Sequence, residues 1–75
     1  MGTYSDTAYV AFGLDEETSQ TSPRYWVAIW DDDGPQSEES YCETKEQAQR
    51  HAAAVALMNA LVAVEVDEFG AVVAA

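Results

Sequence analysis

Residues 24–30 read RYWVAIW, the run with the strongest β-strand composition in the chain because branched and aromatic side chains dominate it. Alternate side chains of a strand point to opposite faces of the sheet. One face would therefore carry Trp26, Ala28 and Trp30, and the other Tyr25, Val27 and Ile29. Both sets are apolar, so we expect each face of this strand to be covered, either by another part of the chain or by a partner.

The flanking sequence predicts further strands around this one. Residues 7–14 (TAYVAFGL) alternate in the same way and predict a first strand. Residues 15–23 are polar and end in a proline, which is typical of a loop, and residues 31–36 (DDDGPQ) are typical of a turn. Residues 40–43 (SYCE) predict a short third strand.

The chain changes character at Thr44, where a helix is predicted to begin. Thr44 and Gln47 have the spacing of a capping box, and Glu46 lies in the first turn, where the helix dipole favours a negative charge. Residues up to Met58 are nearly all strong helix formers, with no glycine or proline. Asn59 is predicted to end the helix, since asparagine tolerates the left-handed cap conformation.

The last part of the chain predicts a strand, a turn and a final short strand. The valines at positions 62, 64 and 66 alternate with alanine and acidic residues, although the helix could instead run on to residue 61 or 63. Residues 67–70 predict the turn and residues 71–74 the final strand. The element order predicts one α+β domain over residues 1–75, in which one helix packs on one face of an antiparallel sheet of three to five strands.

The order of these elements supports the same fold. The chain carries, in order, Trp26 and Val27 in an early strand, a Thr-Lys-Glu helix start at residues 44–46, the helix alanines Ala48 and Ala52–Ala54, and a valine-rich strand with an Asp-x-x-Gly turn at residues 64–70. From Trp26 onward this pattern resembles a family of small uncharacterised bacterial proteins with a ββαβ core. The resemblance implies the fold and nothing about chemistry.

Charge is the most unusual property of the sequence. Fourteen carboxylates against three cations give a net charge of −11, which excludes a conventional binder of DNA, RNA or an anionic membrane surface because phosphates would be repelled. We expect a basic protein as the partner. Most of the acidic side chains fall in predicted loops or at strand ends, and the candidate partner-binding residues are Asp15, Glu16, Glu17, Asp31, Asp32, Asp33, Glu38, Glu39, Asp67 and Glu68. Carboxylates held on turns can imitate the phosphates of a nucleic acid, whereas the alternative is a solvated acidic surface that maintains solubility.

No residue pattern predicts a catalytic site, a metal site or a cofactor. Cys42 and His51 are the only candidate nucleophile and base, and they fall on different predicted elements without a recognised motif. We expect the cysteine to be buried and the histidine to lie on the helix surface. The DDDG turn lacks the spacing of an EF-hand, which leaves only a calcium site between two loops as the alternative, with the ligands Asp31, Asp33 and Asp67.

An uncovered sheet face is the second candidate interaction surface. One helix can cover only one face of the sheet. If its small alanine face accepts the tryptophans, the opposite face shows Tyr25, Val27 and Ile29; in the reverse orientation it shows Trp26 and Trp30. An uncovered apolar face predicts a homodimer or a partner surface, unless the N-terminal segment folds over it.

A small, acidic, motif-free α+β protein is similar in type to the phage-encoded inhibitors of bacterial defence, above all the anti-CRISPR proteins. That similarity, which matches no particular residue, implies a nucleic-acid mimic that blocks a basic channel of a defence complex. The alternative is a small acidic structural or regulatory module that binds a basic protein, including one from a salt-loving organism. The sequence shows no signal-peptide pattern and no apolar run long enough for a membrane span, so we expect a cytoplasmic protein, in the host cytoplasm if phage-encoded.

Overall fold

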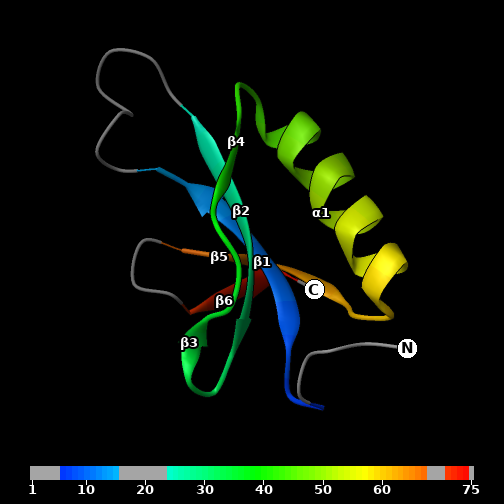
Figure 1. The fold of residues 1–75 in the computed structure, drawn as a ribbon. Coiled ribbons are helices and arrows are strands. Elements are labelled where there is room, and N and C mark those ends of the chain that lie inside the picture. Colours follow the sequence, from blue (N-terminus) through cyan, green and yellow to red (C-terminus); the bar gives the residue numbers. More distant parts are fainter. Residues whose placement is uncertain (1–5, 16–23, 68–70, 75) are drawn as a thin grey trace.

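The computed structural model describes residues 6–15, 24–67 and 71–74 of the chain. Its elements are, in order, β1 (Tyr9–Leu14), β2 (Tyr25–Asp31), β3 (Gly34–Pro35), β4 (Ser40–Cys42), α1 (Lys45–Asn59), β5 (Ala63–Val66) and β6 (Val72–Ala74). The helix lies along one face of the sheet (Figure 1). The prediction of an α+β fold with one helix on a sheet is therefore confirmed. Most of the predicted loop at residues 15–23 and most of the turn at residues 67–70 lie outside the described residues.

The sheet is mixed and has six strands, whereas the sequence predicted three to five antiparallel strands. Its order is β3-β2-β1-β5-β6, with β4 also paired to β2. All pairs are antiparallel except β1 and β5, which run parallel with Val10 opposite Ala63. The helix returns the chain along the sheet, so that β5 runs in the direction of β4. Since β4 and β1 are both antiparallel to β2, β5 is parallel to β1.

The helix begins as the capping pattern predicts. Thr44 Oγ1 accepts a hydrogen bond from the backbone N–H of Gln47 at 3.1 Å. The side-chain oxygen of Gln47 in turn accepts the backbone N–H of Glu43 at 3.0 Å, one residue before the position that a standard capping box would use. Two backbone donors at the start of α1 are thus satisfied by side chains.

The prediction for the end of the helix is wrong in one respect. Asn59 is the last helical residue, but its side chain donates to the carbonyl oxygen of Val55 at 2.9 Å. The left-handed conformation belongs instead to Ala60, with φ 56° and ψ 40°. The backbone N–H of Leu61 then reaches the carbonyl oxygen of Ala56 at 2.8 Å, which closes the helix end.

The core decides which face of the sheet is covered. Three alanines spaced by one helical turn are buried against the sheet, namely Ala48, Ala52 and Ala56. Their partners are branched and aromatic side chains of the first two strands, namely Val10, Phe12, Val27 and Ile29, with Tyr25 partly buried beside them. Because alanine is small, α1 approaches the sheet closely and these medium-sized side chains fill the interface. The orientation in which the helix accepts the tryptophans, leaving Tyr25, Val27 and Ile29 as the open face, is therefore wrong.

Candidate binding surface

The face of the sheet opposite α1 carries a row of aromatic side chains. In the strand register Trp26 lies opposite Tyr41 of β4, and Trp30 lies opposite Tyr9 of β1. The two indole rings are 6.3 Å apart between centroids and tilted by 47°. We call the surface formed by these four side chains the aromatic face. Three of its rings are half-buried, and Tyr41 is exposed.

Small residues lie between the rings of the aromatic face. Ala11 and Ala28 are opposite each other in the register and are both almost fully buried, although no helix of the described residues covers this side. Large rings beside small residues are an efficient way to shield a sheet without a second layer. The Nε1 atom of Trp30 is buried and has no hydrogen-bond partner in the described part of the chain. The part of the Trp30 side chain that a partner can reach is therefore hydrocarbon ring.

One end of the aromatic face already holds a guanidinium group. The Cζ atom of Arg24 lies 4.3 Å from the centroid of the Tyr41 ring, a cation–π contact. Its Nη2 atom lies 3.6 Å from a carboxylate oxygen of Asp15. The hydroxyl of Tyr41 donates to a carboxylate oxygen of Glu39 at 2.9 Å. That hydrogen bond, above all, raises the pKa of Tyr41, and the adjacent negative charges act in the same direction against the opposing charge of Arg24.

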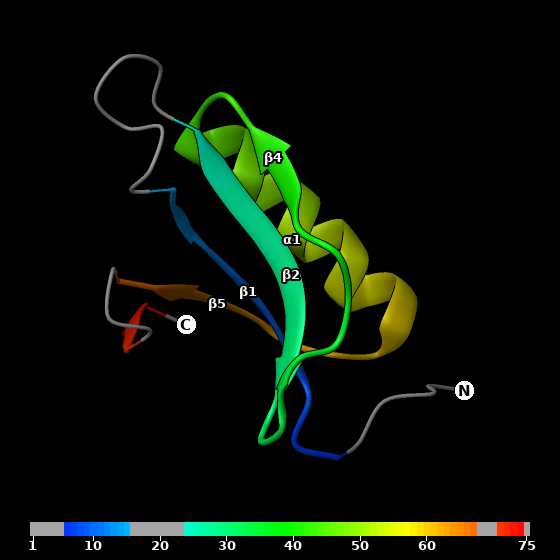
Figure 2. The ribbon, with the colours of Figure 1, turned by 60° about the vertical axis from the view of Figure 1, so that its left-hand side comes forward.

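The predicted acidic turn is an ordered hairpin, which we call the acidic hairpin (residues 31–34). Asp31 Oδ1 accepts the backbone N–H of Asp33 at 2.8 Å and the side-chain amide of Gln36 at 3.1 Å. Gly34 follows with φ 111°, a conformation that other residues rarely adopt. Asp32 and Asp33 are exposed, and the hairpin projects from one end of the sheet (Figure 2). The hydrogen bonds of Asp31 thus order the turn that presents these two charges at the end of a packed strand.

The structure does not gather all the predicted acidic residues at one place. Asp15 follows β1 and Asp67 follows β5, and because these strands are parallel both residues lie at the end of the sheet opposite the acidic hairpin. Glu38 and Glu39 are exposed between β3 and β4. Glu16, Glu17 and Glu68 lie outside the described residues. The carboxylates therefore surround the sheet and do not form one patch.

The same separation bears on the calcium alternative. The ligand set of Asp31, Asp33 and Asp67 is divided between the two ends of the sheet, which excludes a shared ion. Within residues 6–15, 24–67 and 71–74, no group of three or more His, Cys, Asp or Glu side chains could hold a metal ion.

The cations of the chain are neutralised by its own carboxylates. The sequence contains three, Arg24, Lys45 and Arg50. Besides the pair with Asp15, Lys45 Nζ lies 3.0 Å from an Oε atom of Glu65, and Arg50 lies 3.6 Å from Glu46 one helical turn away. The negative field of the remaining carboxylates is therefore not interrupted by any unpaired arginine or lysine.

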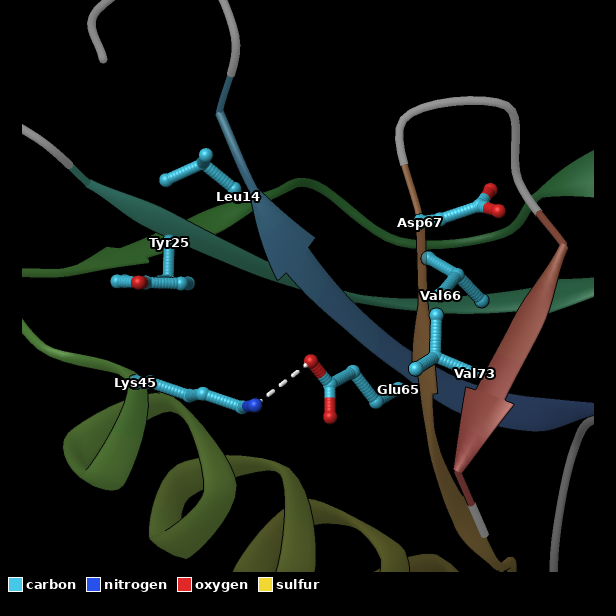
Figure 3. A pocket seen from close by; sticks show the side chains of 7 residues that line it. All are labelled: Leu14, Tyr25, Lys45, Glu65, Val66, Asp67 and Val73. Carbon is cyan, nitrogen blue, oxygen red and sulfur yellow. Dashed lines mark ion pairs between the residues drawn. The ribbon is translucent and has the colours of Figure 1, made fainter.

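A pocket of about 310 Å³ lies between the start of α1 and the ends of β1 and β5 (Figure 3). It is lined by Leu14, Tyr25, Lys45, Glu65, Val66, Asp67 and Val73. Its ammonium and one carboxylate face each other as an ion pair, as the dashed line in Figure 3 shows. Cys42 and His51 do not line it: the cysteine is half-buried against the core, and the histidine is exposed on α1.

Sequence reasoning missed Tyr9 and Tyr41 of the aromatic face, the contact of Arg24 with Tyr41, and one further apolar patch. Tyr41 and Arg24 come together only through the pairing of β4 with β2, and no local pattern reveals that register. Leu57 and Met58 are exposed on the last turn of α1. Both positions lie off the stripe of buried alanines that repeats every four residues along α1, and this is the signal that could have found them.

Comparison with protein families, curated proteins and solved structures found no significant match to this chain. Within the described residues, α1 is too short and too polar to span a membrane. Function is therefore inferred from the charges and rings described above.

Proposed function

We propose that this chain is a non-catalytic inhibitor that mimics nucleic acid and occupies a basic nucleic-acid-binding channel of a bacterial defence complex. The observation that supports this proposal best is the acidic hairpin. Asp32 and Asp33 present exposed carboxylates on a turn that Asp31 stabilises with two hydrogen bonds. Charges that are ordered before binding lose less conformational entropy on docking than charges on a flexible loop.

The distribution of cations supports the same partner class. All three cations pair with carboxylates of the chain itself, and the net charge of the chain is −11, so the field that a distant partner meets is negative. Such a field speeds the encounter with a cationic groove and opposes contact with nucleic acid itself. A partner whose groove normally holds a phosphate backbone has the complementary charge.

A second candidate function follows from the positions of the carboxylates. Because they lie at both ends of the sheet and not on one surface, they also fit a small acidic module of a salt-loving organism, whose surface retains hydration in brine. The two candidate functions predict different effects when one local pair of charges is removed. Removing any two carboxylates should hardly affect a hydration surface. Removing the two that contact the partner should weaken the binding of an inhibitor most.

The test uses a captured partner and two charge-matched variants. The chain is cross-linked in bacterial lysates, the partner is purified, and its binding is titrated with and without duplex DNA. We expect a nucleic-acid-binding protein from which DNA and this chain displace each other. Asp32→Asn/Asp33→Asn should weaken binding about tenfold or more, and Glu43→Gln/Glu46→Gln on the helix side, with the same loss of charge, much less.

Two results would contradict the proposal. Simultaneous binding of DNA and this chain to the partner would exclude occupation of the nucleic-acid channel. Equal losses in the two double variants would show that net charge alone drives binding, and no capture of a nucleic-acid-binding protein would favour the hydration module.

A further inference from the structure

We infer that the aromatic face binds arginine side chains, so that the partner presents an arginine-rich surface and not merely a basic one. This inference rests on the proposed function, because it names the chemistry of the same partner. Three features support it: the contact that Arg24 already makes with Tyr41, the accessible surface of the two indole rings, and the carboxylates at both ends of the aromatic face.

The contact of Arg24 shows which group this face accepts. Its Cζ atom lies over the Tyr41 ring, 4.3 Å from the centroid, while its Nη2 atom lies 3.6 Å from a carboxylate oxygen of Asp15. A planar guanidinium can stack on a ring and direct its N–H groups sideways to a carboxylate, whereas a lysine ammonium is a compact point charge that cannot do both equally well.

The two tryptophans continue the row beyond this contact. Trp26 is the register partner of Tyr41, and Trp30 follows on the same strand with its ring centroid 6.3 Å from that of Trp26. Indole is the best cation–π partner among the aromatic side chains. Because Nε1 of Trp30 is buried, its accessible part offers ring carbon for stacking and no hydrogen-bond donor to repel a cation.

Carboxylates stand at both ends of the row, as they do around Arg24. Glu39 accepts the hydroxyl of Tyr41 at 2.9 Å at one end, and at the other end the exposed Asp32 and Asp33 of the acidic hairpin follow β2, whereas Asp31 itself alternates to the opposite face from Trp30. A guanidinium over an indole ring of this row therefore lies in a strongly negative field. A second copy of the chain is a poor occupant of the same surface, since each copy carries a net charge of −11.

The test compares two peptides that differ only in the cation. Nona-arginine and nona-lysine are titrated against the full chain at the same ionic strength, with tryptophan fluorescence and calorimetry as readouts. We expect nona-arginine to bind about three- to tenfold more tightly and to change the tryptophan emission, while nona-lysine changes it little. Trp26→Leu/Trp30→Leu should remove the preference, and Leu57→Ala/Met58→Ala, on the exposed end of α1, should retain it.

The outcomes separate this inference from the proposed function. Equal affinities for the two peptides, with strong salt dependence, would overturn the arginine preference and leave an electrostatic inhibitor in place. Failure of both peptides to bind would overturn both ideas. If the double tryptophan variant fails to fold, the comparison of the two peptides on the unmodified chain still decides the question. If the chain is a dimer and neither peptide dissociates it, a second copy is the occupant of the aromatic face and the inference is overturned.

Discussion

Gly13 of β1 lies so close to β5 that a Cβ atom at this position would be 2.7 Å from the carbonyl oxygen of Val66. The same atom would lie 3.5 Å from the ring of Trp26. Backbone atoms of a paired strand cannot move aside as a flexible side chain can. This position therefore admits only glycine while the parallel pairing of β1 with β5 is retained. Because Trp26 lies beside the same position, a side chain there would also press on the aromatic face.

The first prediction is that Gly13→Ala destabilises the fold. The added methyl group must displace the backbone of β5, and we expect a loss of about 1–3 kcal/mol in the free energy of unfolding. Urea denaturation followed by circular dichroism measures it. An unchanged midpoint would show that β5 does not pair with β1 as closely as the structure has it.

The second prediction is that Ala60→Gly stabilises the protein. Ala60 holds the left-handed conformation at the end of α1, with φ 56°, where a Cβ atom is unfavourable and glycine is the common residue. We expect a gain of about 0.5–1 kcal/mol in thermal or urea unfolding. Ala54→Gly, at an exposed position within the helix, is the control and should instead lose stability.

The third prediction concerns the buried indole nitrogen of Trp30. Trp30→Phe loses apolar area but also removes a buried donor without a partner, whose cost is about 1–3 kcal/mol. The two effects oppose each other, so the free energy of unfolding should change by less than about 1 kcal/mol. Trp26→Phe removes the same atoms without that compensation and should cost more. Equal losses in the two variants would indicate that the Trp30 nitrogen has a partner in solution.

The fourth prediction concerns the ionisation of Tyr41. Its hydrogen bond to Glu39 raises the pKa of the phenol above the ordinary tyrosine value. The folded state therefore holds this proton more tightly than the unfolded state, and the resulting stability is present below the ordinary pKa and lost as the pH rises through the raised one. Glu39→Gln should lower the pKa of Tyr41, measured by NMR of its ring, whereas Glu38→Gln should change it little.

The fifth prediction separates ordinary acidic proteins from halophilic ones. With a net charge of −11 the folded chain repels itself, and added salt screens that repulsion. We expect the melting temperature to rise between about 0.01 and 0.2 M NaCl and the protein to be fully folded in that range. A chain that stays unfolded at about 0.2 M NaCl and folds only in molar KCl would favour the hydration module over the inhibitor.

The sequence by itself determined most of the elements, because their signals are local, whereas the two-residue strand β3 lies inside the segment predicted as a turn. The apolar run of β2, the cap formed by Thr44 and Gln47, and the alanine stripe of α1 each depend on residues within a few positions of one another. The acidic turn also has a local signal, since the side chain of Asp31 and the backbone of the nearby Gly34 both favour a turn.

Only the tertiary structure decided how these elements meet. A strand that is apolar on both faces has no pattern that shows which face the helix covers. In the structure the small alanines of α1 pack against Val27 and Ile29, which leaves Trp26 and Trp30 on the opposite side. The parallel placement of β5 beside β1 follows from the return path of the helix. Arg24 and Tyr41 meet because strand register joins residues far apart in the chain, and no spacing along the sequence encodes that contact.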